Sequence, residues 1–193
     1  MPTPARKKAS YHHGDLRAAI LRSAGHMMEK QGVAALSLRA AARRAGVSHN
    51  APYRHFPDRD ALLAALAAEG FAQLKQALDG KSGRELGEAY VRFALERPER
   101  FRLMFGGRLA KRGSPDLHAQ AQAAFGALQG AFAGLGADAE YAAAAAWSLV
   151  HGLAHLILDG HLLKARDAAG GNATLVQRVL GTIRLAVGAQ RTA

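Results

Sequence analysis

An all-α fold is the structure that this sequence predicts, and three observations favour it. Apolar residues recur at helical spacing along nearly the whole chain. Ser, Asp and Pro stand where helices would begin, and Gly stands where helices would end. No stretch alternates apolar and polar residues in the way that a half-exposed strand would.

The first helix is expected to follow a basic arm. Residues 1–10 contain two prolines and three cationic side chains, which predicts disorder there. A helix should then run from Leu16 to Gly32. Its buried face is marked by Leu16, Ile20, Ala24 and Met27.

The next two elements form a helix, a sharp turn and a second short helix. Ser37 can cap the first of them, and Gly46 stands where that helix must stop, a position that often needs a positive φ. One face of this helix is apolar: Leu38, Ala41, Ala42 and Ala45. Because proline fits only the first turn of a helix, Pro52 makes the second helix begin at Asn50 or Ala51 and end by Phe56. This arrangement predicts a helix-turn-helix whose second, polar helix enters the major groove of DNA.

The remaining two thirds of the chain also predict helices. Asp58 can cap a long helix over residues 59–78, which would link the helix-turn-helix to a second domain. Asp79 and Gly80 open the first clear break. Further helices are expected at 84–96, 98–105, 116–134, 139–163 and 173–189, with Asp138 as a cap of the fourth.

Charge and composition narrow the class of protein. The net charge is +11, of which residues 1–60 carry +7 and residues 61–193 carry +4, so the excess lies at the helix-turn-helix and suits a polyanion. The chain has no cysteine, which excludes disulfides and thiolate metal sites. No apolar segment follows the basic N-terminus, and polar residues interrupt the apolar run 141–163. We therefore expect a cytoplasmic protein with no membrane partner.

Two short segments resemble a known family. Ala45-Gly46-Val47-Ser48 followed by Tyr53-Arg54-His55-Phe56 resembles the TetR family of bacterial transcription regulators. Tyr11–Arg17 and Trp147…His151-Gly152 resemble a TetR subfamily named for a Trp…His-Gly signature in its C-terminal domain. The chain departs from the family at Ala51, where Thr is frequent, so its base recognition cannot be copied from other members.

The resemblance implies a function and a domain organisation. Residues 11–57 would bind a double-stranded DNA operator, and residues 58–193 would bind an unidentified small-molecule effector and form a homodimer. The function implied is that of a sequence-specific regulator, by family default a repressor that the effector releases. Neither a cofactor nor a metal is expected.

The expected DNA contacts lie around the helix-turn-helix. Asn50 suits a contact to adenine and His49 a contact to a purine, although both could instead serve the turn or a cap. Arg39 could reach a base edge or a phosphate, or simply be solvated, while Tyr53 and His55 match family phosphate contacts. The full set of expected DNA-binding residues is Arg6, Lys7, Lys8, Ser37, Arg39, Ser48, His49, Asn50, Ala51, Tyr53, His55 and Arg59.

A ligand site is expected in the second domain. Trp147, His151, His155 and Asp159 recur every four residues on one helix face. This stripe could hold a metal, but a pocket wall is the better functional interpretation, with His151 as its polar group. The predicted effector-binding residues, each of which could also be plain core, are Phe93, Phe101, Met104, Phe105, Trp147, His151 and His155.

The last helix is expected to pair with its copy in a homodimer. Its apolar stripe consists of Leu175, Val179, Ile183 and Val187. Two other function classes stay open beside the regulator. A nonspecific architectural DNA-binding protein would need basic charge over its whole surface, and a metal-binding enzyme would rest on the His151, His155 and Asp159 stripe alone.

Overall fold

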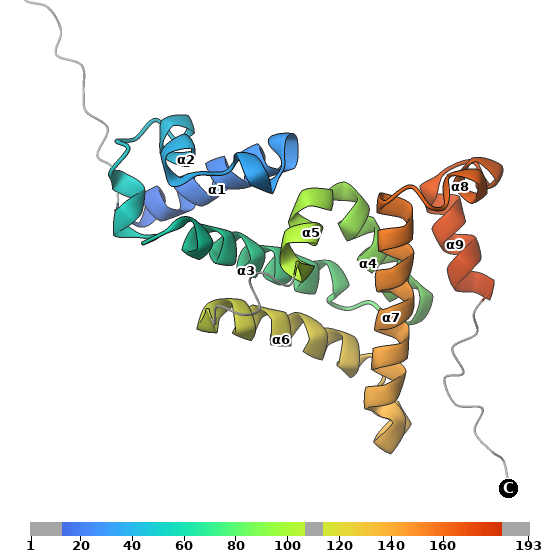
Figure 1. Ribbon diagram of the computed structural model, residues 1–193. Helices are drawn as coiled ribbons and strands as arrows, with labels where there is room; N and C mark the ends of the chain where they lie inside the picture. The colour runs from blue at the N-terminus through green and yellow to red at the C-terminus, as the bar shows by residue number, and fades with distance from the viewer. Residues whose placement is uncertain (1–12, 107–113, 183–193) are drawn as a thin grey trace, which may run out of the picture. The chain divides into compact units, whose positions relative to one another are not determined.

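Helices make up all the regular structure in the residues that the computed structural model describes, which are 13–106 and 114–182 (Figure 1). The predicted all-α fold class is confirmed. The α-helices are α1 (His13–Gln31), α2 (Leu38–Arg44), α3 (Arg59–Leu78), α4 (Gly83–Glu96), α5 (Pro98–Phe105), α6 (Pro115–Gly130), α7 (Ala139–Leu158), α8 (Leu163–Ala169) and α9 (Asn172–Thr182). Three 3-10 helices join them: η1 (Val33–Ala35), η2 (Ala51–Arg54) and η4 (Ala133–Asp138).

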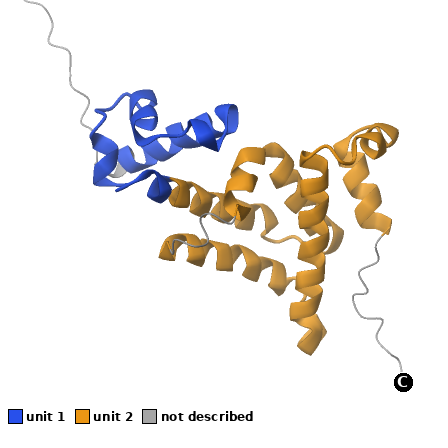
Figure 2. Cartoon of the chain, in the orientation of Figure 1, with its two compact units in different colours: residues 1–62 blue, residues 63–193 orange. Residues whose placement is uncertain are grey.

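The chain forms two compact units, residues 1–62 and residues 63–193 (Figure 2). The division falls within α3, so this helix begins in unit 1 and continues in unit 2. The functional boundary expected after residue 57 stays a prediction.

Unit 1 follows the signals in its sequence closely. The Ser37 hydroxyl accepts a hydrogen bond of 3.1 Å from the Ala40 N–H and thereby caps α2. Gly46 has a φ of 70° in the turn that follows. The Asp58 carboxylate accepts a bond of 2.7 Å from the Ala61 N–H and caps α3. The core contains the expected face of α1 together with Leu38, Ala41, Ala42 and Phe56.

The second element of the motif is shorter than an α-helix. It is the single 3-10 turn η2, with Pro52 buried in its first turn. Asn50 precedes η2 but its side chain makes no capping bond, whereas the Ser48 hydroxyl lies 3.4 Å from the Asn50 N–H. The late start forced by Pro52 is confirmed, and the chain has room for only one turn before Pro57.

Unit 2 is built around α4, which packs against α5, α7 and α9. Three of these helices meet at Gly87, where an added Cβ would come within 3.0 Å of Leu180 and 3.3 Å of Val150. A side chain at this position would make Leu180 and Val150 shift by a few tenths of an ångström, so glycine favours the close approach of α4 to α7 and α9. Helix α6 packs against α7, and α8 packs against α9.

Two predicted elements of unit 2 need correction. The helix expected over 139–163 ends at Leu158, because Gly160 has a φ of 77° and turns the chain before α8 begins. The helix expected to reach residue 134 ends at Gly130 and is followed by η4. Asp138 does precede α7, but its side chain makes no capping bond.

Candidate nucleic-acid interface and ligand cavity

The expected DNA-binding residues of unit 1 lie mostly at its surface. Six of them are exposed: Ser37, Arg39, Ser48, His49, Asn50 and Tyr53. Ala51 and His55 are half-buried. Tyr53 is 47% exposed, although it stands in an element with a buried proline, so its ring is presented to solvent rather than to the core. Arg6, Lys7 and Lys8 lie outside the described residues.

Arg59 has a structural role within unit 1. Its guanidinium donates hydrogen bonds of 2.8 Å to the Leu36 carbonyl and 2.6 Å to the Val33 carbonyl. These carbonyls lie at η1 and the residue after it, where the chain turns from α1 into α2. This contact ties α3 to the preceding turn, and the expected phosphate contact at Arg59 stays a prediction.

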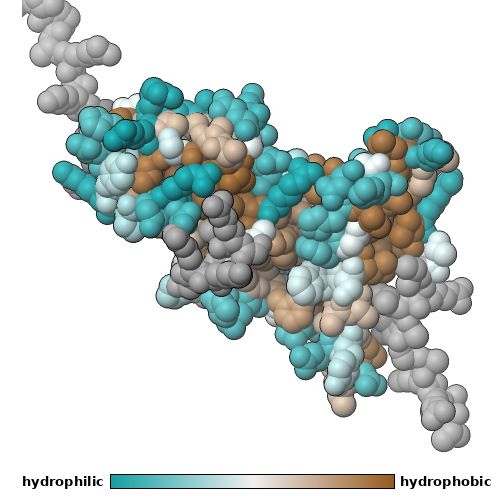
Figure 3. Space-filling view, in the orientation of Figure 1, coloured by the Kyte–Doolittle hydropathy of each residue, from teal (hydrophilic) through white to brown (hydrophobic). Residues whose placement is uncertain are grey.

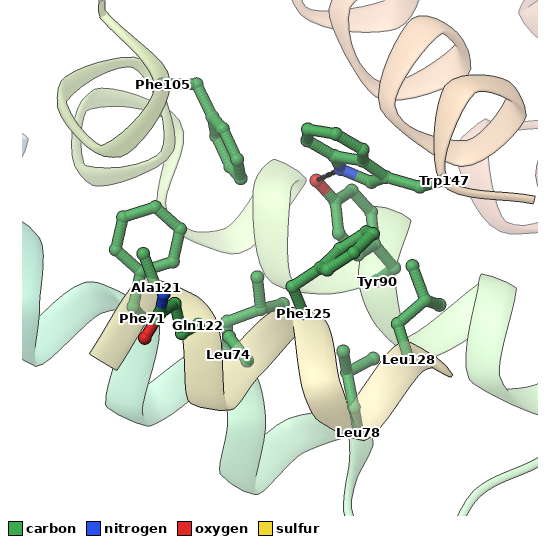
Figure 4. A pocket seen from close by; sticks show the side chains of 11 residues that line it. Phe71, Leu74, Leu78, Tyr90, Phe105, Ala121, Gln122, Phe125, Leu128 and Trp147 are labelled. Atoms are coloured by element: carbon green, nitrogen blue, oxygen red, sulfur yellow. Dashed lines mark hydrogen bonds between the residues drawn. The ribbon is translucent and has the colours of Figure 1, made fainter. Parts of the chain in front are cut away.

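A cavity of about 400 Å³ lies inside unit 2 (Figure 4). Five helices line it, and almost all of its surface is carbon. The lining residues are Phe71, Leu74 and Leu78 of α3, Tyr90 of α4, Phe105 of α5, Ala121, Gln122, Ala124, Phe125 and Leu128 of α6, and Trp147 of α7. A concave, mainly apolar site of this volume has the properties of a small-molecule site.

Two of the seven expected effector-binding residues, Phe105 and Trp147, line this cavity. Their rings lie 6.2 Å apart between centroids. The other five pack behind or away from the wall. Phe101 stacks on Tyr90 and His151, Met104 packs against Gly70, and Phe93 is core beneath the Arg97 guanidinium.

The walls formed by α3 and α6 are absent from the predicted ligand site. Phe71, Leu74 and Leu78 recur at helical spacing in the segment that was predicted only as a linking helix. Phe125 lies in an alanine-rich segment, where no ligand-binding residue was predicted. The signal that could have found it is a large aromatic residue among small ones, because small neighbours leave space that a cavity can occupy.

A short chain of hydrogen bonds runs along one wall of the cavity. The Trp147 indole N–H donates to the Tyr90 hydroxyl oxygen at 3.0 Å, and the Tyr90 hydroxyl lies 2.9 Å from the His151 Nδ1 (Figure 4 draws the first of these bonds). Burial raises the pKa of the Tyr90 hydroxyl well above its ordinary value, so the phenol is protonated. Burial, followed by the charge of nearby His155, lowers the pKa of His151.

All three residues of the predicted stripe, His151, His155 and Asp159, make contacts with other side chains. The Asp159 carboxylate accepts a bond of 3.3 Å from Arg102. The rings of His151 and His155 stack edge to face at 4.7 Å. Among the described residues, no group of three or more His, Asp or Glu side chains is placed to hold a metal ion.

Two residues of the expected dimer stripe lie in the described part of α9. Leu175 is 6% exposed and belongs to the core of unit 2, whereas Val179 is half-buried. Helix α9 itself packs against α4 and α8. Ile183 and Val187 lie outside the described residues.

Helix α7 leaves an apolar surface uncovered. Tyr141 is 76% exposed and Leu156 is 45% exposed on this helix. Figure 3 shows hydrophobic residues at the surface between α7 and α9. Within the described residues, Ala133–Leu158 is the one helical stretch long and apolar enough to cross a membrane. Its other face is buried within unit 2 through Val150 and Leu153.

Two family models match the sequence. Residues 20–66 match the bacterial regulatory proteins of the tetR family, and residues 84–183 match a tetracyclin repressor-like C-terminal domain. No curated protein sequence matches the chain.

Solved structures share the fold. A protein with unknown function from Rhodococcus sp. RHA1 is 35% identical over 91% of this chain and 96% of its own, with a TM-score of 0.76. A tetR-family transcriptional regulator from Streptomyces coelicolor is 21% identical over 87% of this chain and 89% of its own, with a TM-score of 0.61. A TetR family transcription regulator from Marinobacter aquaeolei VT8 is 21% identical over 87% and 93%, with a TM-score of 0.59.

One family model covers most of the helix-turn-helix unit, and the other covers most of the unit that contains the cavity. Together they show that this protein belongs to the TetR family of bacterial transcription regulators.

Proposed function

We propose that this regulator is a homodimeric, cytoplasmic repressor that leaves its DNA operator when a small molecule fills the cavity of unit 2. The observation that carries the proposal is the course of α3. This helix starts in the helix-turn-helix unit, and three of its residues, Phe71, Leu74 and Leu78, line the cavity. A ligand in contact with α3 can bias the DNA-competent state if it binds the two states with different affinity.

Residues of the turn and of η2 would read the operator. Asn50 and His49 are exposed at the start of η2, where side chains reach base edges in helix-turn-helix complexes. Ser37, Arg39, Ser48, Tyr53 and His55 would contact phosphates or sugars and fix the register. Arg6, Lys7 and Lys8 would add sequence-independent charge, and Ala51 would contact a thymine methyl group.

Within this proposal, the protein is a member of the TetR subfamily with the Trp…His-Gly signature, which lies in unit 2. Trp147 forms a cavity wall and His151 supports it through Tyr90, so both named residues of the signature serve the same site. Within this proposal the domain that binds effector and partner comprises residues 58–193.

The exposed faces of α7 and α9 would form the dimer interface. Tyr141, Ala145, Ser148 and Leu156 lie on the uncovered side of α7, at spacings of four, three and eight residues. Small residues between Tyr141 and Leu156 allow close helix approach, and the exposed apolar area is of the kind that marks an interaction surface.

The test begins with selection of binding sequences from a random DNA library. The expected product is a near-palindrome with half-sites about one helical turn apart or a multiple of that. Thermal-shift screening of small molecules should then find ligands that raise the melting temperature, because they bind only the folded state. Such ligands should release the selected DNA.

Matched variants connect release to the cavity. Phe125→Ala enlarges the cavity and should impair the ligand response while the protein keeps its operator affinity. Leu163→Ala, an exposed apolar residue of α8 away from the cavity, is the control. Release that is unaffected by Phe125→Ala, at all ligand concentrations, contradicts the proposal.

A further inference from the structure

Aromatic rings make up much of the described lining of the cavity. Five of its lining residues are aromatic: Phe71, Tyr90, Phe105, Phe125 and Trp147. Among the lining residues in the described part of the chain there is no Lys, Arg, His, Asp or Glu. A charged ligand would lose its hydration without gaining a counter-ion, which is costly. The lining therefore favours uncharged aromatic molecules.

The polar end of the cavity has a fixed hydrogen-bond direction. Trp147 has one N–H, which can only donate, so the Tyr90 oxygen accepts at 3.0 Å. The Tyr90 O–H then donates to His151 Nδ1 at 2.9 Å, with the proton of the neutral imidazole on Nε2. The opposite tautomer would leave the Tyr90 proton without an acceptor in an apolar wall. The chain thus runs from Trp147 through Tyr90 to His151.

This direction leaves Tyr90 with one acceptor site and no donor. A phenolic oxygen has two lone pairs, and Trp147 uses one of them. Figure 4 shows the Tyr90 hydroxyl beside the Trp147 indole, with Phe105 and Phe125 around them. Gln122 is the other lining residue with a polar side chain apart from Tyr90 and Trp147, and it is exposed at the surface of α6.

We propose that the cavity selects uncharged aromatic molecules that donate one hydrogen bond to the Tyr90 oxygen, as phenols do, and that the chain from Trp147 to His151 sets this preference. The inference rests on the proposed effector function and names the ligand class of the same site. It makes Tyr90 the residue that determines polar specificity, and His151 a positioning residue that holds the Tyr90 proton away from the ligand.

The test compares three probes of similar shape on the full-length protein by titration calorimetry. Para-hydroxybiphenyl can donate a hydrogen bond, para-methoxybiphenyl can only accept one, and biphenyl-para-carboxylate is charged at pH 7.5. A neutral hydrogen bond should make the hydroxy compound bind about three- to tenfold more tightly than the methoxy compound. The carboxylate should bind about a hundredfold more weakly, or not at all.

Three variants locate the preference. Tyr90→Phe removes the acceptor, so the hydroxy-to-methoxy affinity ratio should fall to the value set by size alone. His151→Leu frees the Tyr90 O–H to donate into the cavity, so the methoxy compound should gain affinity and the ratio should also fall. Gln122→Leu is the control, and the ratio should stay as in the unaltered protein. Should Tyr90→Phe fail to fold, the His151→Leu comparison decides alone.

The outcomes separate this inference from the proposed function. Equal affinity for the hydroxy and methoxy compounds overturns the inference but leaves the cavity as a ligand site. The inference is also overturned if the preference for the hydroxy compound persists in both Tyr90→Phe and His151→Leu, or if it disappears in Gln122→Leu. If no biphenyl binds to protein that still binds its selected DNA, the inference fails. The proposed function fails only if the thermal-shift screen also yields no ligand that releases DNA.

Discussion

Arg59 has a structural role that its position in the sequence does not reveal. From the sequence it is a cation in the first turn of a helix that follows a helix-turn-helix, which suits a phosphate contact. In the structure its guanidinium is engaged by the Val33 and Leu36 carbonyls. The sequence could not show this because the partners are backbone atoms more than twenty positions away.

Arg59→Ala should destabilise unit 1. Two hydrogen bonds from a charged donor would be lost, and the expected cost is about 2–4 kcal/mol of unfolding free energy. Urea denaturation measures it. The matched control is Arg39→Ala, an exposed residue that should leave stability within about 0.5 kcal/mol while weakening operator binding. Normal stability of Arg59→Ala together with weaker DNA binding would show instead that Arg59 contacts phosphate.

His151 makes stability depend on pH. Its pKa in the folded protein lies below the ordinary value of 6.5, so the unfolded chain binds a proton more readily. The stability contributed by neutral His151 is present above pH 6.5 and is lost as the pH falls below that value. Melting temperatures between pH 7.5 and 5 should therefore decrease less in His151→Leu than in the unaltered protein. Parallel curves for the two proteins would contradict this assignment.

At the scale of elements, capping residues predicted boundaries well where they act locally. Ser37 and Asp58 cap the helices that they were expected to cap, and α5 spans the predicted 98–105. The prediction failed at Asp159 and Gly160, where hydrophobic periodicity continues to Leu163 although the backbone turns. Hydrophobic periodicity indicates which face of a helix is apolar. It does not indicate whether the periodic segment forms one helix or two.

Gly160 should tolerate few substitutions. Its φ of 77° costs an L-residue about 1–2 kcal/mol, and asparagine is among the residues that adopt this conformation most readily. We expect Gly160→Ala to lower the unfolding free energy by about 1 kcal/mol and Gly160→Asn to lower it by less. Chemical denaturation of the two variants provides the measurement. An unchanged or higher stability of Gly160→Ala would show that α7 can continue through this position.

At the scale of the whole molecule, the candidate cavity was predictable only in part. Trp147 and Phe105 could be predicted from the sequence because each is a large aromatic residue on an amphipathic helix. The contributions of α3 and α6 depend on which helices become neighbours in unit 2, and that is set by tertiary packing around α4. The predicted dimer stripe on α9 stays a prediction, since Leu175 is buried within one chain while Ile183 and Val187 lie outside the described residues.

Leu156→Glu should separate the proposed dimer. Leu156 is 45% exposed on α7, so the substitution leaves the protomer core intact but would bury a charge in the interface. Analytical ultracentrifugation should show a monomer, and operator affinity should fall by at least a hundredfold because one reading element has few contacts. Gln76→Glu, at an exposed position of α3 outside the proposed interface, is the comparison for added charge alone. A dimeric Leu156→Glu protein with full operator affinity would place the interface elsewhere.

The shortness of η2 has a consequence for how the protein finds its targets. One turn of four residues presents few side chains to the bases, so each half-site can specify only a few base pairs. A short recognition sequence recurs by chance many times in a genome that offers about a million or more competing sites. Occupancy of any one promoter then depends on how many copies of the regulator a cell contains relative to these near-matches. We expect selected sequences to show a compact core in each half-site, and the regulator to control several promoters whose ranking follows small differences in spacing and groove shape.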